Sequence, residues 1–395
     1  MAFIRSERVA AFLLLLAAAL GLLAANTAVG PALMELQDAH LAIPGTPLDL
    51  SVGHWISDGL LAVFFFVVAV ELKNEFAVGQ LNTVSKAIRP AIAALGGVLV
   101  PALIYLGITA GSGYEGGWPI PTATDIAFAL GVLAVFGKGI PSRLRIFILA
   151  LAILDDIVAI LIIAVFFTAD PNLLLMGAGV VGVAIFGLLS RFLDTRFRLL
   201  VASAMIAVAL VTWSLVYLSG VHATIAGVAL GLVMVRKPAL RLRHRLEPIA
   251  NGAILPLFAF SAALVAIPQV AASELAAPFW AILIALPVGK IVGISLGGWL
   301  SSFVGPRERR PHLTLHGLVA AGALGGVGFT VSLLMNELAF ARAPEVADEG
   351  TLAVLLGSSI SIVIAAVLVS TLAGTYRRLR RLRQAAELRI ASDTS

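Results

Sequence analysis

The sequence contains no cysteine and few charged residues. Without cysteine, disulfide bridges, thiolate metal sites and thiol catalysis are all excluded. Lys, Arg, Asp and Glu make up 12% of the 395 residues, against about 25% in a soluble domain. Hydrophobic residues make up 60%. This composition excludes a soluble globular protein and predicts an all-α polytopic membrane protein, with residues 1–395 forming a single transmembrane domain.

Long apolar runs recur along the whole chain. A spanning helix takes about 20 apolar residues, so the apolar content is enough for about twelve. The first run begins at Val9 and is longer than the core of a signal peptide, so it is predicted to be a span rather than a cleaved signal. The twelve predicted spans are residues 9–29, 57–72, 88–109, 121–136, 144–168, 172–190, 198–218, 221–235, 248–267, 277–300, 314–335 and 352–375.

Basic residues lie almost entirely on one side of these spans. All but two of the 27 Lys and Arg residues fall on the same side, the exceptions being Arg342 in an opposite loop and Lys290 inside a span. The positive-inside rule makes that side cytoplasmic. Both termini are therefore predicted to be cytoplasmic, in a bacterial inner membrane. The basic balance of the chain is explained by topology, and no nucleic acid partner is predicted.

Two segments outside the spans are predicted to have structure of their own. In the outer loop at about residues 35–54, two short alternating runs flank Pro44-Gly45, which predicts a β-hairpin. The cytoplasmic tail, about residues 376–395, is basic and helix-prone. It is interpreted either as a helix on the anionic lipids of the inner leaflet or as a simple stop-transfer charge cluster.

Four ionisable residues lie well inside apolar spans, namely Asp125, Asp155, Asp156 and Lys290. Each costs about 2.5–3.5 kcal/mol at the centre of a span. Together they oppose insertion by roughly 10–14 kcal/mol. Such a cost predicts a functional site that faces the protein interior.

Asp155 and Asp156 are adjacent in the middle of an apolar helix. Neighbouring side chains on a helix point about 100° apart, so both carboxylates can face one cavity. Two such acids resist ionising together and are expected to titrate as a coupled pair. Their oxygen atoms suit protons or a hard cation such as Na⁺ or Li⁺, and no soft ligand favours a transition metal. Competition between proton and cation at one site would produce exchange.

Two spans are interrupted by glycine or proline, at residues 116–124 and 317–330. Interrupted spans in the two halves of a chain predict a midplane site in a transporter with inverted repeats. Close helix packing is the alternative for the glycine-rich segment. Broken helices expose positive N-terminal and negative C-terminal ends. Asp125 would offset the positive ends, and Lys290 either the negative ends or the carboxylates.

Other candidate residues lie near the ends of spans. Glu71 and Glu75 share one helix face at the cytoplasmic end of the second span. With Glu247 they would form a funnel that attracts cations and senses pH, the alternative being an ordinary solvated helix end. His222 begins the eighth span on the outer side, where a lone histidine is more commonly a simple interfacial residue.

Seven segments in this order resemble the NhaA-type sodium/proton antiporters of bacteria. They cover nearly the whole chain and are residues 69–75, 121–128, 154–157, 220–227, 255–260, 289–290 and 325–330. The rule on interrupted helices was itself drawn in part from members of this family, so it is not independent support.

The resemblance implies roles for most of these residues. Asp155 and Asp156 would bind cation and protons, with Thr124 and Asp125 at the crossing of spans 4 and 11 and Lys290 as the charged partner. Glu71, Glu75 and His222 would belong to pH regulation, and the outer hairpin would form a homodimer contact.

The chain departs from the family pattern at Asn74, where arginine is expected, and at Arg243-His244, where an acid precedes the histidine. Both changes put pH sensing in doubt. The cation site itself shows no departure.

The predicted function is export of Na⁺ or Li⁺ in exchange for H⁺, without a cofactor. An intramembrane aspartyl protease would need acids on two helices and a Gly-x-Gly-Asp segment, which this sequence lacks. A prenyl- or phosphatidyl-transferase would need further spaced aspartates for Mg²⁺. The remaining alternative is a sodium-coupled symporter or a cation channel of similar architecture.

Overall fold

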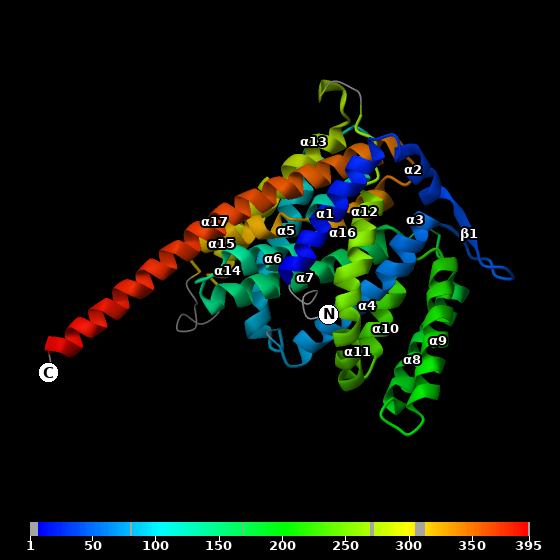
Figure 1. Ribbon diagram of the computed structural model, residues 1–395, viewed down its shortest axis with the longest axis horizontal. Coiled ribbons are helices and arrows are strands. Elements are labelled where there is room, and N and C mark those ends of the chain that lie inside the picture. Colours follow the sequence, from blue (N-terminus) through cyan, green and yellow to red (C-terminus); the bar gives the residue numbers. More distant parts are fainter. Residues whose placement is uncertain (1–6, 80, 169, 269–271, 305–312, 394–395) are drawn as a thin grey trace. The chain divides into compact units, whose positions relative to one another are not determined.

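The computed structural model describes residues 7–79, 81–168, 170–268, 272–304 and 313–393. Residue 5 and residues 307–310, whose basic side chains the sequence analysis assigns to the cytoplasmic side, lie outside these ranges. The described chain is mostly helical, with one small two-stranded sheet (Figure 1). It divides into two compact units, which are described separately. Unit 1 comprises Met1–Thr83, Ile157–Ala276 and Leu333–Leu352, and unit 2 comprises Val84–Asp156, Ala277–Ser332 and Ala353–Ser395.

Unit 1 contains the β-hairpin, helices on either side of it in the sequence and a group of helices from the middle of the chain. Two apolar clusters form its core, one around Phe66 and Phe186 and one around Trp213 and Leu50. The elements of this unit are α1 (Glu7–Ala25), α2 (Gly30–Asp38), β1 (His40–Ala42), β2 (Asp49–Ser51), α3 (Val52–His54), the π-helical turn η1 (Trp55–Leu60), α4 (Leu61–Ala77), α8 (Leu173–Leu189), α9 (Arg198–Leu218), α10 (Thr224–Val233), α11 (Arg236–Ile249), the π-helical turn η5 (Ala250–Ile254) and α12 (Leu255–Ala262).

Unit 2 is built around a cluster of buried apolar side chains that includes Ile148, Leu151, Ile294 and Leu324. Three helices, α7 (Ser142–Phe166), α16 (Phe329–Ala339) and α17 (Pro344–Asp393), have residues in both units. The other helices of unit 2 are α5 (Val84–Thr109), α6 (Ile126–Phe136), α13 (Ala277–Ile284), the π-helical turn η7 (Ala285–Gly289), α14 (Lys290–Ser301) and α15 (Leu315–Gly325).

Within the described ranges, eight helices are long and apolar enough to cross a membrane, and ten if each of two bent pairs is one span. The eight correspond to predicted spans. The bent pairs correspond to the first and eleventh predictions, with bends of 109° and 51°. The predicted eighth span contains only the ten-residue α10, and the ninth is divided among α11, η5 and α12. Multiple apolar spans are thus present, whereas the count of twelve stays a prediction.

The outer loop contains the predicted hairpin. β1 and β2 are antiparallel, with Leu41 opposite Leu50, and Gly45 has a positive φ of 79° in the turn. The prediction missed α2, which begins with Pro31 in its first turn and precedes the hairpin. Proline is favoured there because the first helical N–H groups have no partner within the helix. At the other end of the chain, the helix-prone tail is helical and continues α17 as far as Asp393 (Figure 1).

Helices α5 and α14 pack closely within unit 2 through glycines. The backbones of Gly96 and Gly293 approach so closely that a methyl group on either would overlap the carbonyl of the other. Small residues allow this approach between helices in a membrane. The packing brings the N-terminal end of α14, which begins at Lys290, against the middle of α5.

The glycine contact predicts that Gly96→Ala destabilises the protein. Overlap in a packed interior costs about 1–3 kcal/mol, which outweighs a gain of up to about 1 kcal/mol from the helix propensity of alanine. Gly107→Ala is the control, because Gly107 lies on the same helix with no atom near its added methyl group. Thermal unfolding of the purified protein should show a lower Tm for Gly96→Ala alone, and an equal Tm in the two variants would contradict this packing.

Candidate ion-binding site

The candidate site forms where two helical segments of unit 2 are interrupted. Before α6, a 3₁₀ turn (Ile120–Thr122) gives way to extended backbone, with Ala123 at φ −81° and ψ 154°. Pro119 and Pro121 favour this break, because proline has no N–H to donate and restricts the residue before it. The second interruption, residues 326–328, separates α15 from α16 and contains two glycines.

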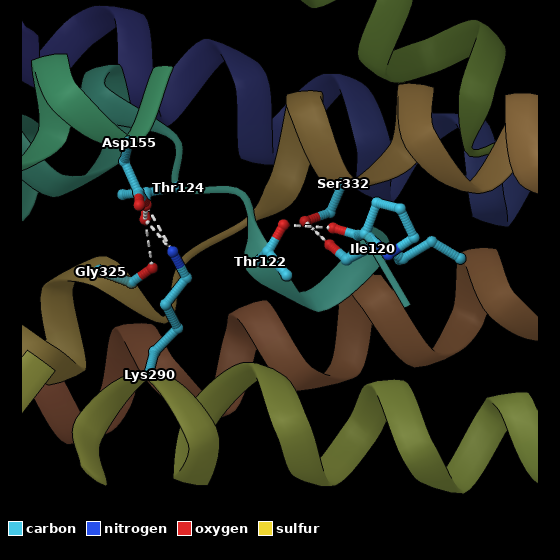
Figure 2. Close-up of polar contacts among 8 residues, drawn as sticks. Ile120, Thr122, Thr124, Asp155, Lys290, Gly325 and Ser332 are labelled. Carbon is cyan, nitrogen blue, oxygen red and sulfur yellow. Dashed lines mark hydrogen bonds and ion pairs between the residues drawn. The ribbon is translucent and has the colours of Figure 1, made fainter. Parts of the chain in front are cut away.

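The two interruptions are hydrogen-bonded to each other. The backbone N–H of Asp125 donates to the carbonyl of Val327 at 2.6 Å. The hydroxyl of Thr124 lies 2.7 Å from the carbonyl oxygen of Gly325, at the C-terminal end of α15 (Figure 2). Polar backbone groups that each break leaves without helical partners thus find partners at the other break, as buried groups require.

Asp125 caps two helices at once. One carboxylate oxygen accepts from the N–H of Phe128, in the first turn of α6, at 3.2 Å. The other accepts from the N–H of Thr330 at 3.2 Å and from its hydroxyl at 2.6 Å, at the start of α16. The side chain is buried. Its negative charge therefore lies at the positive ends of both half-helices, as the sequence analysis predicted.

Lys290 and Asp155 form a fully buried ion pair. The Lys290 ammonium pairs with Oδ2 of Asp155, and their side chains are 0% and 1% exposed. The same ammonium donates to the hydroxyl oxygen of Thr124 at 3.0 Å, and Thr124 also lies within hydrogen-bonding reach of Asp155. Figure 2 shows the three side chains converging beside Gly325. The sequence left open which acid meets Lys290, and the structure places Asp155 in direct contact.

The carboxylate of Asp155 retains capacity for a further ligand. Lys290 and Thr124 both contact Oδ2, whereas Oδ1 is buried and accepts no hydrogen bond from the described residues. Asp156, the next residue of α7, is partly buried and lies within electrostatic range of the Lys290 ammonium. The single Lys290 ammonium thus lies near two carboxylates, which together carry more negative charge when ionised than one ammonium balances. This excess suits the binding of a further cation.

Lys290 is positioned by a local departure from regular helix. It directly follows the π-helical turn η7, which contains Pro287. Such turns shift the register of a helix and are frequent at functional sites. Sequence reasoning located Lys290 but did not predict this turn.

The predicted funnel residues lie in unit 1, and Arg243 of α11 joins two of them. Its guanidinium is 3.1 Å from a carboxylate oxygen of Glu71 and 3.7 Å from one of Glu247. Glu75 lies one turn beyond Glu71 on α4. The second departure from the family pattern, Asn74, accepts a hydrogen bond from Arg236 at 3.1 Å. Both unusual residues therefore link α4 to α11.

His222 is not part of this group. It lies between α9 and α10, and its Nε2 is 3.0 Å from Asp58 of η1. Asp58 and Glu71 are thirteen residues apart on a continuous helical segment, which corresponds to about 20 Å. The structure therefore separates His222 from the three glutamates with which the prediction grouped it.

Sequence reasoning missed two buried or partly buried acids, Asp58 and Glu337. Asp58 is the second residue of a predicted span, and Glu337 lies two residues beyond the end of another. The signal that could have identified them is the apolar sequence around each residue: extending the predicted spans by one helical turn places both acids inside a span.

The double cap predicts an unusually large effect of Asp125→Ala on stability. Loss of one helix cap costs about 0.5–2 kcal/mol, so loss of two costs about 1–4 kcal/mol. Asn172→Ala provides the control, because Asn172 caps α8 alone from an exposed position. Thermal unfolding should show a Tm loss for Asp125→Ala about twice that for Asn172→Ala, and equal losses would contradict a double cap.

Comparison with known proteins agrees with the resemblance seen in the sequence. The model of the family described as Na⁺/H⁺ antiporter 1 matches residues 1–369. The chain is 59% identical over 388 residues to the Na(+)/H(+) antiporter NhaA 2 of Clavibacter michiganensis subsp. michiganensis, covering 97% of this chain and 94% of that protein. It is 45% identical over 380 residues to the Na(+)/H(+) antiporter NhaA of Tropheryma whipplei, covering 93% and 95%. The identity to the protein of the same name from Mycolicibacterium smegmatis is 41% over 390 residues, covering 95% and 88%. The chain is therefore a member of the Na⁺/H⁺ antiporter 1 family.

Proposed function

We propose that this protein is a sodium (or lithium)/proton antiporter that exports the cation in exchange for inward H⁺. The observation that carries the proposal is the buried contact of Lys290 with Asp155, beside Asp156. The relatives at 41–59% identity are named Na⁺/H⁺ antiporters, which supports the same activity. Two carboxylates and one ammonium in an apolar interior can exchange a proton for a cation without any cofactor.

The proposed architecture is a single transmembrane domain of twelve spans with inverted repeats, in which spans 4 and 11 cross at the midplane. Support comes from the hydrogen bonds between the two interruptions within unit 2. The proposed location is the bacterial inner membrane with both termini cytoplasmic, supported by the distribution of basic residues.

In the proposed site, Asp155 and Asp156 bind the cation or protons, and Thr124, Asp125 and Lys290 support them. A cation that binds Asp155 competes with the Lys290 ammonium for the same carboxylate, because two adjacent positive charges in a low-dielectric interior repel strongly. Cation binding therefore favours loss of protons from the site. The reverse step, protonation, weakens the hold on the cation and releases it.

The proposed cycle is alternating access, in which one helical bundle rocks after the site has exchanged its ions. If both acids exchange protons for one Na⁺, each cycle moves net charge and is driven by voltage.

For pH regulation we propose Glu71, Glu75, Glu247 and His222. Membrane lipids and a second copy of the chain, contacted through the hairpin, complete the proposed partners.

The site assignment predicts that Asp155→Asn and Asp156→Asn each abolish exchange. Asparagine keeps the size of the side chain but cannot balance the charge of a cation or release a proton. Everted vesicles containing the wild-type protein should show Na⁺-dependent dissipation of a proton gradient, measured with a pH-sensitive dye. Asp170→Asn is the control, because Asp170 is exposed in a loop.

Full exchange by either site variant would contradict the assignment. Cation flux without opposite proton movement would instead favour a channel or a symporter.

Thr124→Val should weaken cation binding more than Thr122→Val. Valine at residue 124 removes a hydroxyl oxygen that lies within hydrogen-bonding reach of the Asp155 carboxylate, and loss of such a buried polar partner from the cation site costs about 1–3 kcal/mol. The Na⁺ concentration for half-maximal exchange should therefore rise about fivefold or more. Thr122 is equally buried but bonds only the nearby carbonyl of Pro119 among the described residues (Figure 2). Equal effects of the two substitutions would contradict a role for Thr124 at the site.

A further inference from the structure

Unit 1 contains a second group of ionisable side chains, at the end of α4 next to the hairpin. Asp58 lies on η1, His222 in the turn between α9 and α10, and Glu337 near the C-terminal end of α16. These segments are far apart in the sequence. The ion-binding site described above uses none of these three residues.

His222 and Asp58 are in direct contact. Nε2 of His222 is 3.0 Å from Oδ1 of Asp58, and each side chain is only 9% exposed. The other ring nitrogen of His222 is 2.7 Å from the hydroxyl of Thr224. Oδ1 of Asp58 is buried and accepts no hydrogen bond from the described residues, so it keeps the capacity to take up a proton beside His222.

Glu337 joins the same group through the residue before Asp58. The hydroxyl of Ser57 donates to Oε1 of Glu337 at 3.3 Å. Glu337 and Asp58 are close enough for their charges to interact. The other titratable groups that face the cluster are His54, within electrostatic range of Asp58 and His222, and Tyr217, within range of Asp58.

The backbone around Asp58 is held in place. The indole N–H of Trp213 donates to the carbonyl oxygen of Asp58 at 2.9 Å. Trp213 in turn stacks on Trp55 and Tyr217, with ring centroids 5.5 and 5.8 Å apart. Because Asp58 lies within a π-helical turn, its position depends on this aromatic stack rather than on regular helix geometry. The site is therefore preformed.

The charges of the cluster do not balance if every carboxyl group is ionised. Among the described residues His222 lies against Asp58, and Glu337 accepts from the neutral hydroxyl of Ser57. An uncompensated carboxylate in such surroundings is costly, and binding a proton removes that cost. The close spacing of the groups, 3.0 Å between His222 and Asp58 and 3.3 Å between Ser57 and Glu337, suits a proton better than a larger cation that would have to separate them.

We propose that Asp58, His222 and Glu337 form a second proton-binding site, separate from Asp155 and Asp156. On release, the O–H bond of the Glu337 carboxyl breaks and the proton passes to water, which leaves one additional negative charge on the cluster. Uptake is the reverse step. The proposal does not depend on the transported ion.

Infrared difference spectra of the purified full-length protein in lipid, recorded across a pH series, test this proposal. Wild-type protein should show a carbonyl-stretch band of a buried protonated carboxyl that disappears as pH rises. Glu337→Gln should remove that band, and Ser57→Ala should shift its frequency by removing the hydroxyl donor. Glu345→Gln, at an exposed residue of the nearby α17, should leave the band unchanged, and so should Asp155→Asn.

A band that persists unchanged in both Glu337→Gln and Ser57→Ala would overturn the proposal. Loss of the band on adding Na⁺ at constant pH would also overturn it, because the site would then bind a cation. Ser57→Ala keeps the test valid if Glu337→Gln fails to fold. If vesicles show no Na⁺/H⁺ exchange while the titrating band is present, the proposed function fails and this inference stands.

Discussion

The buried ion pair between Lys290 and Asp155 is the interaction on which the rest of unit 2 depends. Neither charge is exposed, so neither can be lost without leaving the other uncompensated, a change that typically costs about 3–5 kcal/mol. The structure around the pair satisfies the remaining polar groups: Thr124 contacts both partners and the end of α15, and Asp125 caps α6 and α16. The interrupted helices are thus a condition for keeping a charged site inside an apolar bundle.

The same feature explains how such a site can release what it binds. An ion pair that balanced every carboxylate would be inert, whereas here one ammonium faces two acids and Oδ1 of Asp155 accepts no hydrogen bond from the described residues. The cluster of Asp58, His222 and Glu337 in unit 1 has a similar imbalance between acids and bases. In both proposed sites this imbalance favours the binding of a proton.

Much of this could be predicted from the sequence, because charged residues are conspicuous in apolar spans. Proline and glycine made three features predictable: the hairpin and the two interruptions near residues 124 and 327. The helix dipole made the position of Asp125 at two helix ends predictable. The partner of Lys290 was not, since it depends on tertiary packing through Gly96 and Gly293 and on the π-helical turn before Lys290. Asp58 and Glu337 were missed because the limits of predicted spans are uncertain by several residues. The departure from the family pattern at Arg243 was visible in the sequence, but its ion pairs with Glu71 and Glu247 could be identified only from the structure.

The central claim is that cation and protons compete for the carboxylates beside Lys290. The most direct test is to titrate purified protein with Na⁺ in weakly buffered solution and to record cation binding and proton release together. The account predicts that each Na⁺ bound releases at least one proton, and that the apparent Kd for Na⁺ rises at least about tenfold for each pH unit lowered while the site is protonated. Na⁺ binding with no proton release and a Kd independent of pH would contradict it.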